Sequence, residues 1–376
     1  MVIAKENAPH LRRKASVTRM MADVLIALIP TLVFSAIVYP LQTLIFYLTS
    51  VAIMVSAEFV YVGLKNMMPA DGQKHSFKER FIYAYKGKFN QNNVLTAGIS
   101  AVIFTLIMPA GAPIYAVIIG ALVGIVLGKL VFGGLGSNIF NPAAVGMLFA
   151  KVCFGTQYQT NVETWYYKIP NAVAGATPLG GTDSAIANAV NNMQSYNFPS
   201  LLLGQVPGTL GEVYVITILV GAIYLLIRRS ADFRVMLPYL GLFGLLSLVA
   251  GLSIYAVDGA TNPFAFAAYY LLTGGVLFGG VFMLTDPVTS PINSPSRIIY
   301  AMVAAVSTIF IRLFAALPEG VGFSILIANM IAVVLDHYEW SSPRYTWKKF
   351  LAMGLLVVIP ALVIFFVIKF GGIYHA

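Results

Sequence analysis

The chain has 376 residues, of which 59% are hydrophobic and only 10% are charged. Soluble domains carry about a quarter charged residues, so this composition excludes an ordinary soluble protein and indicates one that lies in a membrane. The formal net charge is +9, but the Lys and Arg residues gather in a few loops between apolar runs, which is typical of a topology signal and speaks against nucleic-acid binding.

Apolar runs long enough to cross a bilayer recur along the whole chain. A spanning helix needs about 20 residues, because the hydrocarbon layer is about 30 Å thick and backbone groups in lipid must bond within their own segment. We expect spans near residues 21–39, 43–64, 94–108, 114–132, 142–155, 213–227, 235–254, 264–284, 298–315, 320–335 and 350–370. The sequence therefore predicts an all-α polytopic membrane protein with about ten transmembrane helices in two inverted five-helix repeats, plus an extra C-terminal helix.

The inverted arrangement follows from the odd number of spans on each side of a long polar segment. We predict a cytoplasmic N-terminus at 1–20, a first membrane repeat at 21–155, an extracytoplasmic segment at 156–212, a second repeat at 213–335, and a C-terminal loop with the extra helix at 336–376. With this orientation, 19 of the 23 Lys and Arg residues fall on the cytoplasmic side, which is the usual bias. The predicted location is the cell (inner) membrane.

Each predicted repeat contains a stretch that resembles one in the other repeat. VFGGLGSNIFNPAAVG at 131–146 and LFGGVFMLTDPVTSP at 277–291 each carry an FGG triplet and then a polar residue before proline, Asn141-Pro142 and Asp286-Pro287. Inverted repeats interrupted by Gly and Pro build sites from broken helices near the membrane midplane. The alternatives are ordinary Gly-rich helix packing and, for Asn141 and Asp286, simple capping of a helix that begins with proline.

Acidic residues in or beside the apolar runs are the candidates for an ion pathway. Glu58 lies within a span, Asp23 opens the first span, and Asp336 follows the tenth. A carboxylate among apolar residues is costly and therefore a functional candidate, although Glu58 and Asp336 could instead reach toward nearby basic groups. With one cysteine and scattered histidines, the sequence predicts no metal site, and it contains no recognisable catalytic triad.

The stretch NAVAGATPLGG at 171–181 is informative only when it is considered together with several other stretches of the chain. Taken with GKLVFGGLGSNIFNPAAVG (128–146), GEVYVITILVGAIYLLIRR (211–229), FMLTDPVTSP (282–291), RLFAALPEGVGFSILIANM (312–330) and LDHYEWSSPR (335–344), it makes the chain resemble the NqrB/RnfD family of membrane subunits from about residue 8 to residue 349. GATPL, and the lack of the long N-terminal extension expected of NqrB, look more like RnfD.

The resemblance implies a flavin. In that family the threonine of the Gly-Ala-Thr motif is joined to FMN through a phosphoester, and Thr177 matches it. A flavin transferase would make this bond during maturation. The resemblance also makes a second, non-covalent flavin (riboflavin) possible, with Asn141, Asp286 and Thr289 as candidates to contact a flavin ring.

The implied function is that of the D subunit of an Rnf-type complex, a ferredoxin:NAD⁺ oxidoreductase that acts as a Na⁺ or H⁺ translocase. Its partners would be the other Rnf subunits, including a second flavin-bearing one, and the lipid bilayer. Two alternatives stay open: an NqrB-like subunit of a Na⁺-translocating NADH:quinone reductase, and a urea-channel-like transporter without a redox cofactor. The family core is expected to end near Arg344, so the span at 350–370 lies beyond it.

Overall fold

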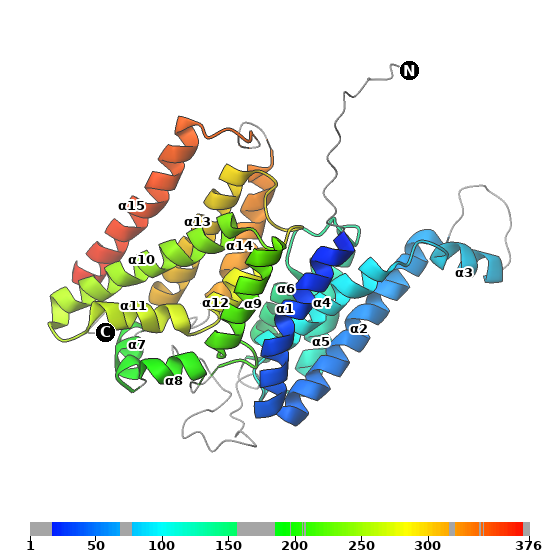
Figure 1. Ribbon diagram of the computed structural model, residues 1–376, viewed down its shortest axis with the longest axis horizontal. Coiled ribbons are helices and arrows are strands. Elements are labelled where there is room, and N and C mark those ends of the chain that lie inside the picture. The colour runs from blue at the N-terminus through cyan, green and yellow to red at the C-terminus, as the bar shows by residue number, and fades with distance from the viewer. Residues whose placement is uncertain are drawn as a thin grey trace.

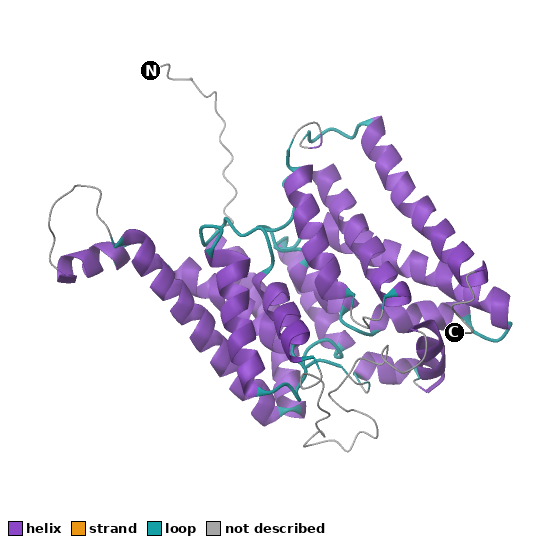
Figure 2. Ribbon diagram, turned by 180° about the vertical axis from the view of Figure 1, so that it is seen from behind, coloured by secondary structure: helices purple, strands orange, loops and turns teal. Residues whose placement is uncertain are grey.

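The computed structural model describes residues 17–67, 77–155, 185–195, 197–204, 206, 208–315, 320–337, 340 and 342–370. Over these residues every regular element is a helix (Figure 2). Thr177 and most of the segment 156–212 lie outside the described residues.

The first half of the chain contains six helices, one of them extended by a π-helical turn. They are α1 (Val17–Val38), α2 (Pro40–Asn66), α3 (Phe77–Tyr85), α4 (Gln91–Ile107), α5 (Ile114–Ile125) with the turn η1 (Val126–Leu130), and α6 (Pro142–Phe154). Two short helices follow, α7 (Ala185–Ser195) and α8 (Phe198–Leu203). Helices α3, α7 and α8 fall in regions where the sequence predicted only polar connections.

The second half repeats the series with one broken element. It contains α9 (Val215–Arg228), α10 (Phe233–Asp258), α11 (Pro263–Leu272), α12 (Val276–Phe278) with the π turn η2 (Gly279–Met283), α13 (Ser294–Phe314) and α14 (Val321–Leu335). The last helix is α15 (Trp347–Phe370).

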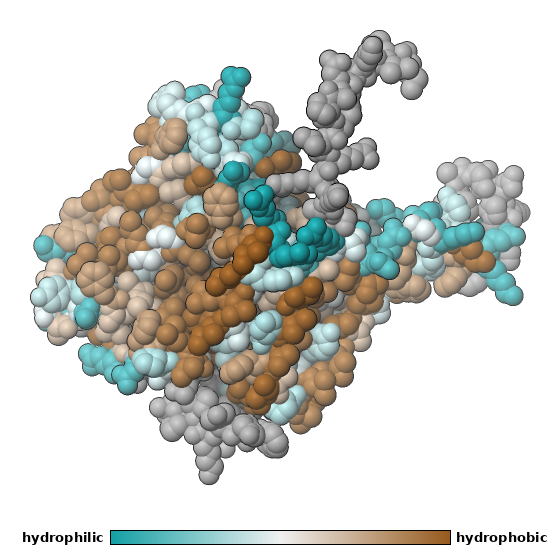
Figure 3. All heavy atoms as spheres, in the orientation of Figure 1, coloured by the Kyte–Doolittle hydropathy of each residue, from teal (hydrophilic) through white to brown (hydrophobic). Residues whose placement is uncertain are grey.

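The apolar character of these helices confirms a polytopic membrane protein. Five described helices, α1, α2, α10, α13 and α15, are long and apolar enough to cross a bilayer, and α11 with α12–η2 forms a bent sixth span. Helices α4, α5–η1, α6, α9 and α14 are apolar but shorter. Figure 3 shows the result on the surface, a broad apolar belt with polar side chains gathered at the end where α1 begins. Such a belt is typical of a surface that faces lipid or other membrane-embedded subunits.

The two halves pack in the same order. In the first half α2 packs against α4 and α5, and α5 against α6; in the second half α10 packs against α11 and α13, and α13 against α14. The halves meet through α1 with α9 and through α6 with α14. Helices α1 and α9 run in opposite directions across the molecule (Figure 1). This is the arrangement expected of inverted five-helix repeats.

The predicted span at 264–284 is broken, with its two parts bent by 59°. The break is built on Gly274 and Gly275, whose φ angles are +62° and +75°; this region favours glycine because it has no Cβ. Arg312 of α13 holds the break, donating to the carbonyls of Tyr270 (2.8 Å), Thr273 (3.0 Å) and Gly274. A charged side chain thus satisfies the carbonyls that α11 leaves unpaired at its end.

The FGG triplets do not mark equivalent positions in the two halves. The first triplet lies in the loop after η1, whereas the second lies within α12 and η2. Asn141-Pro142 begins α6, the fifth spanning element of its half, but Asp286-Pro287 lies in the loop before α13, the fourth. The two stretches resemble each other because both leave a π turn for a polar loop, and both loops reach the same cavity.

Candidate functional site

A cavity lies between the two halves, toward the end of the molecule where α1 begins. The cavity has a volume of about 70 Å³, which is room for roughly five water molecules. Its polar lining includes Thr96, Ser100, Lys129, Asn138, Asn141, Ser230, Thr285 and Asp286; its apolar lining includes Met21, Val24, Ile99, Ile103, Leu135, Leu225, Val281, Phe282 and Val288. Both halves therefore supply walls of one small, mixed site.

A buried ion pair forms the first-half wall. The Lys129 ammonium lies 2.9 Å from Glu58 Oε2, and both side chains are almost fully buried. Lys129 also donates to the hydroxyl of Thr96 at 2.9 Å, and the Asn93 amide donates to Glu58 Oε1 at 3.0 Å. Lys129 lies in η1, and π turns within α-helices occur frequently at functional sites. Because each charge has an opposite partner and a further hydrogen bond, the pair is tolerated inside the protein.

Asp286 supplies a second carboxylate from the other half. It lies in the loop after η2, where its side chain accepts from the backbone N–H of Val288 at 3.2 Å and from the hydroxyl of Thr289 at 3.4 Å. Burial raises the pKa of Asp286, and the two hydrogen bonds and the charge of Lys129 oppose this rise. Lys129 thus pairs with Glu58 of its own half, and its charge also favours the ionised form of Asp286 in the other half. With all three groups ionised, this trio carries a net charge of −1.

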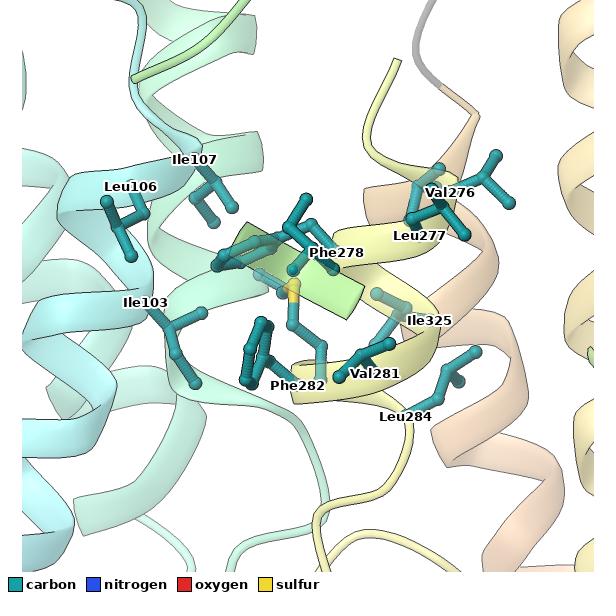
Figure 4. Close-up of a cluster of buried hydrophobic side chains, with 14 of the residues drawn as sticks. Ile103, Leu106, Ile107, Val276, Leu277, Phe278, Val281, Phe282, Leu284 and Ile325 are labelled. Atoms are coloured by element: carbon teal, nitrogen blue, oxygen red, sulfur yellow. The ribbon is translucent and has the colours of Figure 1, made fainter. Parts of the chain in front are cut away.

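Packed apolar side chains close the cavity on the side away from the end where α1 begins. Ile103 and Ile107 of α4 point toward Phe278 and Phe282 of α12–η2 (Figure 4). Ile103 and Phe282 also line the cavity. A cation leaving the cavity in this direction would have to shed its water among aromatic and aliphatic groups.

A larger polar pocket of about 580 Å³, which we call the vestibule, adjoins the cavity. The two share Ser230, Ala231, Thr285 and Pro287; Arg229, Arg234 and Arg297 also line the vestibule. Arg297 forms an ion pair with Asp232, and Arg234 donates to the hydroxyl of Ser294. The vestibule therefore presents three guanidinium groups against a single carboxylate, Asp232, among its lining residues.

Of the three residues predicted to contact a flavin, two line the cavity and one does not. Asn141 lines the cavity, but its side-chain oxygen also accepts from the backbone N–H groups of Ala143 (3.0 Å) and Ala144 (3.3 Å), so it caps α6. Asp286 lines the cavity and orders its own loop. Thr289 is buried behind Asp286. The capping interpretation is thus correct for Asn141, and it does not exclude a further contact inside the cavity.

The three ion-pathway candidates lie in different surroundings. Glu58 reaches the cavity only through Lys129. Asp23 joins α1 to the end of α9, because it accepts from Ser230 at 2.6 Å and pairs with Arg228 at 3.2 Å. Asp336 ends α14 and accepts from the backbone N–H of Ile292 at 3.0 Å. The structure therefore brings Glu58, but not Asp23 or Asp336, into the charged cluster.

Lys129 is the main site residue that the sequence interpretation missed. The charge bias places it among the cytoplasmic basic residues, although it lies inside the predicted span 114–132. A lysine within an apolar run was the available signal, since such groups usually face a partner or a cavity. Arg312, inside the predicted span 298–315, carried the same signal.

Comparisons with known proteins agree on one family. The model of the NQR2, RnfD, RnfE family matches residues 4–344. The chain is 36% identical over 243 residues to the B subunit of the Na⁺-translocating NADH-quinone reductase of Chromohalobacter salexigens, and the match covers 64% of this chain and 57% of that protein.

Two further relatives extend the comparison. The corresponding quinone-reductase protein of Ectopseudomonas mendocina is 32% identical over 292 residues, 74% of this chain and 64% of that protein. The D subunit of the proton-translocating ferredoxin:NAD⁺ oxidoreductase complex of Clostridium ljungdahlii is 27% identical over 350 residues, 88% of this chain and 93% of that protein. The chain thus spans less than two thirds of the two quinone-reductase subunits and nearly the whole of the ferredoxin-linked one.

Proposed function

Because the chain belongs to the NQR2, RnfD, RnfE family, we propose that it is the D subunit of an Rnf-type complex that couples electron transfer to the movement of Na⁺ or H⁺ across the cell (inner) membrane. The observation that carries this choice is the match with the ferredoxin-linked subunit over 93% of its length. The Gly-Ala-Thr motif ending at Thr177 supports the redox role.

The cavity supplies the features that ion coupling needs. Lys129 and the Asp286 carboxylate line it, Glu58 pairs with Lys129 from behind the lining, and apolar packing closes it on one side. A cation in the cavity would compete with Lys129 for Glu58 and Asp286. Any change that shifts Lys129 between these carboxylates changes the affinity for that cation, which is the linkage that coupling requires. The quinone-reductase relative is named for Na⁺ translocation and the ferredoxin-linked relative for proton translocation, so the relatives do not favour either ion for this chain.

Thr177 is the proposed attachment point of FMN, through a phosphoester to its hydroxyl. When bound, the flavin supplies one- and two-electron chemistry, while the protein provides position and electrostatics. Thr177 lies outside the described residues, but α7 and α8, which follow its segment, lie at the end of the molecule opposite the start of α1 (Figure 1). With the N-terminus in the cytoplasm, as the basic loops predict, this end is extracytoplasmic.

A second, non-covalent flavin stays a prediction from the resemblance, and the cavity offers it little space in the present arrangement. The space suits roughly five water molecules or a small cation, whereas a tricyclic ring would enter only after lining side chains moved. We therefore assign no step to a second flavin. The identity of 32–36% to quinone-reductase subunits favours an NqrB-like subunit as the second candidate function.

Flavin attachment tests the redox proposal. The chain should be produced with its partner subunits and a flavin transferase, separated on a denaturing gel, and viewed for flavin fluorescence alongside an intact mass measurement. We expect a fluorescent band that disappears in Thr177→Ala and persists in the neighbouring control Thr182→Ala. A wild-type chain without bound flavin would overturn the proposal and favour a urea-channel-like transporter. Reduction of quinone rather than NAD⁺ by the intact complex would identify the NqrB-like alternative.

A further inference from the structure

The start of α15 forms a pocket that the ion-coupling site does not use. The pocket has a volume of about 570 Å³ and is lined by Trp340, Ser342, Thr346, Trp347, Lys348 and Lys349. The start of α15 lies at the same end of the molecule as the start of α1 (Figure 1). Helix α15 follows the region matched by the family model, which ends at residue 344.

Lys349 places a buried positive charge in this pocket. Its side chain is only 1% exposed, and its ammonium donates to the carbonyl of Ser342. None of the ion pairs between described residues includes Lys349. A buried charge without an opposite charge is costly. Lys348 also lines the pocket, and the buried ammonium of Lys349 suits the pocket to an anion.

The apolar surface beside the pocket narrows the choice of anion. In its C-terminal half α15 buries Pro360, Ile364 and Ile368. From Phe350 to Ile359, by contrast, no residue of α15 is buried, and large apolar side chains such as Leu351, Leu355 and Ile359 are about half exposed. The first turns of the helix therefore leave room for apolar chains directly beneath the charged pocket.

The aromatic residues fix the level of the pocket in the bilayer. Trp347 is 71% exposed and lies at the first position of α15, and Trp340 lines the other side of the pocket. Tryptophan favours the boundary between lipid headgroups and hydrocarbon. The pocket therefore lies at headgroup depth, which is where a phosphate would stand if its acyl chains followed α15.

We propose that this pocket binds the headgroup of an anionic phospholipid. Lys349 and Lys348 pair with the phosphate, the hydroxyl of Thr346 donates to it, and the acyl chains lie along the loosely packed first half of α15. A soluble phosphate would gain the charge pairing but would leave the adjoining apolar surface uncovered. A phospholipid would pair its phosphate with the lysine and cover the apolar surface with its acyl chains. It would thereby stabilise the packing of α15 against the loop that follows α14.

Quenching of tryptophan fluorescence tests the site, because two of the three tryptophans of the chain line it. The purified full chain, carrying Trp165→Phe, would be placed in phosphatidylcholine vesicles that contain either phosphatidylglycerol or phosphatidylcholine with brominated acyl chains, at equal mole fractions. We expect stronger quenching by the phosphatidylglycerol. Each basic residue near an anionic lipid contributes about 1 kcal/mol, so Lys349→Gln should weaken the preference about fivefold.

Three variants separate binding from folding. Lys349→Arg keeps the charge and should retain the preference, while Lys369→Gln at the opposite end of the same helix should leave it unchanged. If Lys349→Gln does not fold, the exposed Lys348→Gln provides the same test. Equal quenching by both lipids in the parent chain, or an undiminished preference in Lys349→Gln and Lys348→Gln, overturns the proposal. Loss of the preference on adding inorganic phosphate would show a free-phosphate site and would also overturn it.

Discussion

The buried pair of Glu58 and Lys129 allows a quantitative test of the charged cavity. Replacing Lys129 by Met keeps most of the length of the side chain and removes its charge. The change deletes the 2.9 Å ion pair to Glu58 and the 2.9 Å hydrogen bond to Thr96, and it leaves the Asn93 amide bonded to the Glu58 carboxylate. The carboxylate is then buried without an opposite charge beside it.

The expected cost follows from the distance and the burial. Unit charges 2.9 Å apart attract by about 6 kcal/mol at an effective dielectric constant of about 20. Part of this is offset because removing Lys129 also relieves the desolvation cost of its own charge, and broken buried pairs typically cost about 3–5 kcal/mol. We therefore expect Lys129→Met to lower the free energy of unfolding by about 4 kcal/mol. The double variant Glu58→Gln/Lys129→Met should recover at least about 2 kcal/mol of this loss.

Unfolding in bicelles, followed by steric trapping, measures this free energy directly. The matched control is Lys65→Met at the end of α2, an exposed lysine that donates to the carbonyl of Gly133 at 3.0 Å. An exposed contact of this kind contributes less than about 1 kcal/mol. Equal losses for Lys129→Met and Lys65→Met would refute the reasoning, as would a double variant in which the two single effects simply add.

Three further substitutions test contacts outside the cavity. Asp23→Asn removes a charge-assisted bond to Arg228, so we expect a loss of about 1.5–3 kcal/mol and faster hydrogen exchange in α1; unchanged exchange would contradict this. Gly124→Ala would place its Cβ 2.6 Å from the carbonyl oxygen of Pro142 and should cost about 1–3 kcal/mol in thermal unfolding, whereas Gly98→Ala has nothing within 4 Å and should be tolerated. Arg312→Lys keeps the charge but not the forked geometry, so hydrogen exchange should rise at the α11–α12 break; equal protection would show that the break does not need the guanidinium.

Most of the fold could be predicted because lipid imposes a simple rule on the chain. Each predicted span corresponds to an apolar helix or helix pair, since every buried backbone group must bond locally. The break within 264–284 could not be placed from the sequence. It depends on Arg312 reaching the carbonyls of another helix. The glycine pairs of the two FGG triplets make no such break, because the pair at 133–134 lies in a loop and the pair at 279–280 in a π turn. The FGG similarity therefore described local composition and not equivalent positions.

The candidate site was only half predictable for a related reason. Asn141 and Asp286 could be singled out because a polar residue before proline interrupts a helix, and both line the cavity. Lys129 could not be joined to Glu58 from the sequence, because the contact depends on how α2, α4 and η1 pack together. Thr177 remains a prediction from the Gly-Ala-Thr motif.

The arginines of the vestibule have a consequence for passive leakage. Arg229, Arg234 and Arg297 concentrate positive potential in a cleft with low-dielectric walls, which raises the energy of any cation that arrives from that side. The packed rings of Phe278 and Phe282 oppose the same cation by dehydration. For a cation that crossed the subunit, an electrostatic barrier and a hydration barrier would thus stand in series, and together they would limit leakage through the protein.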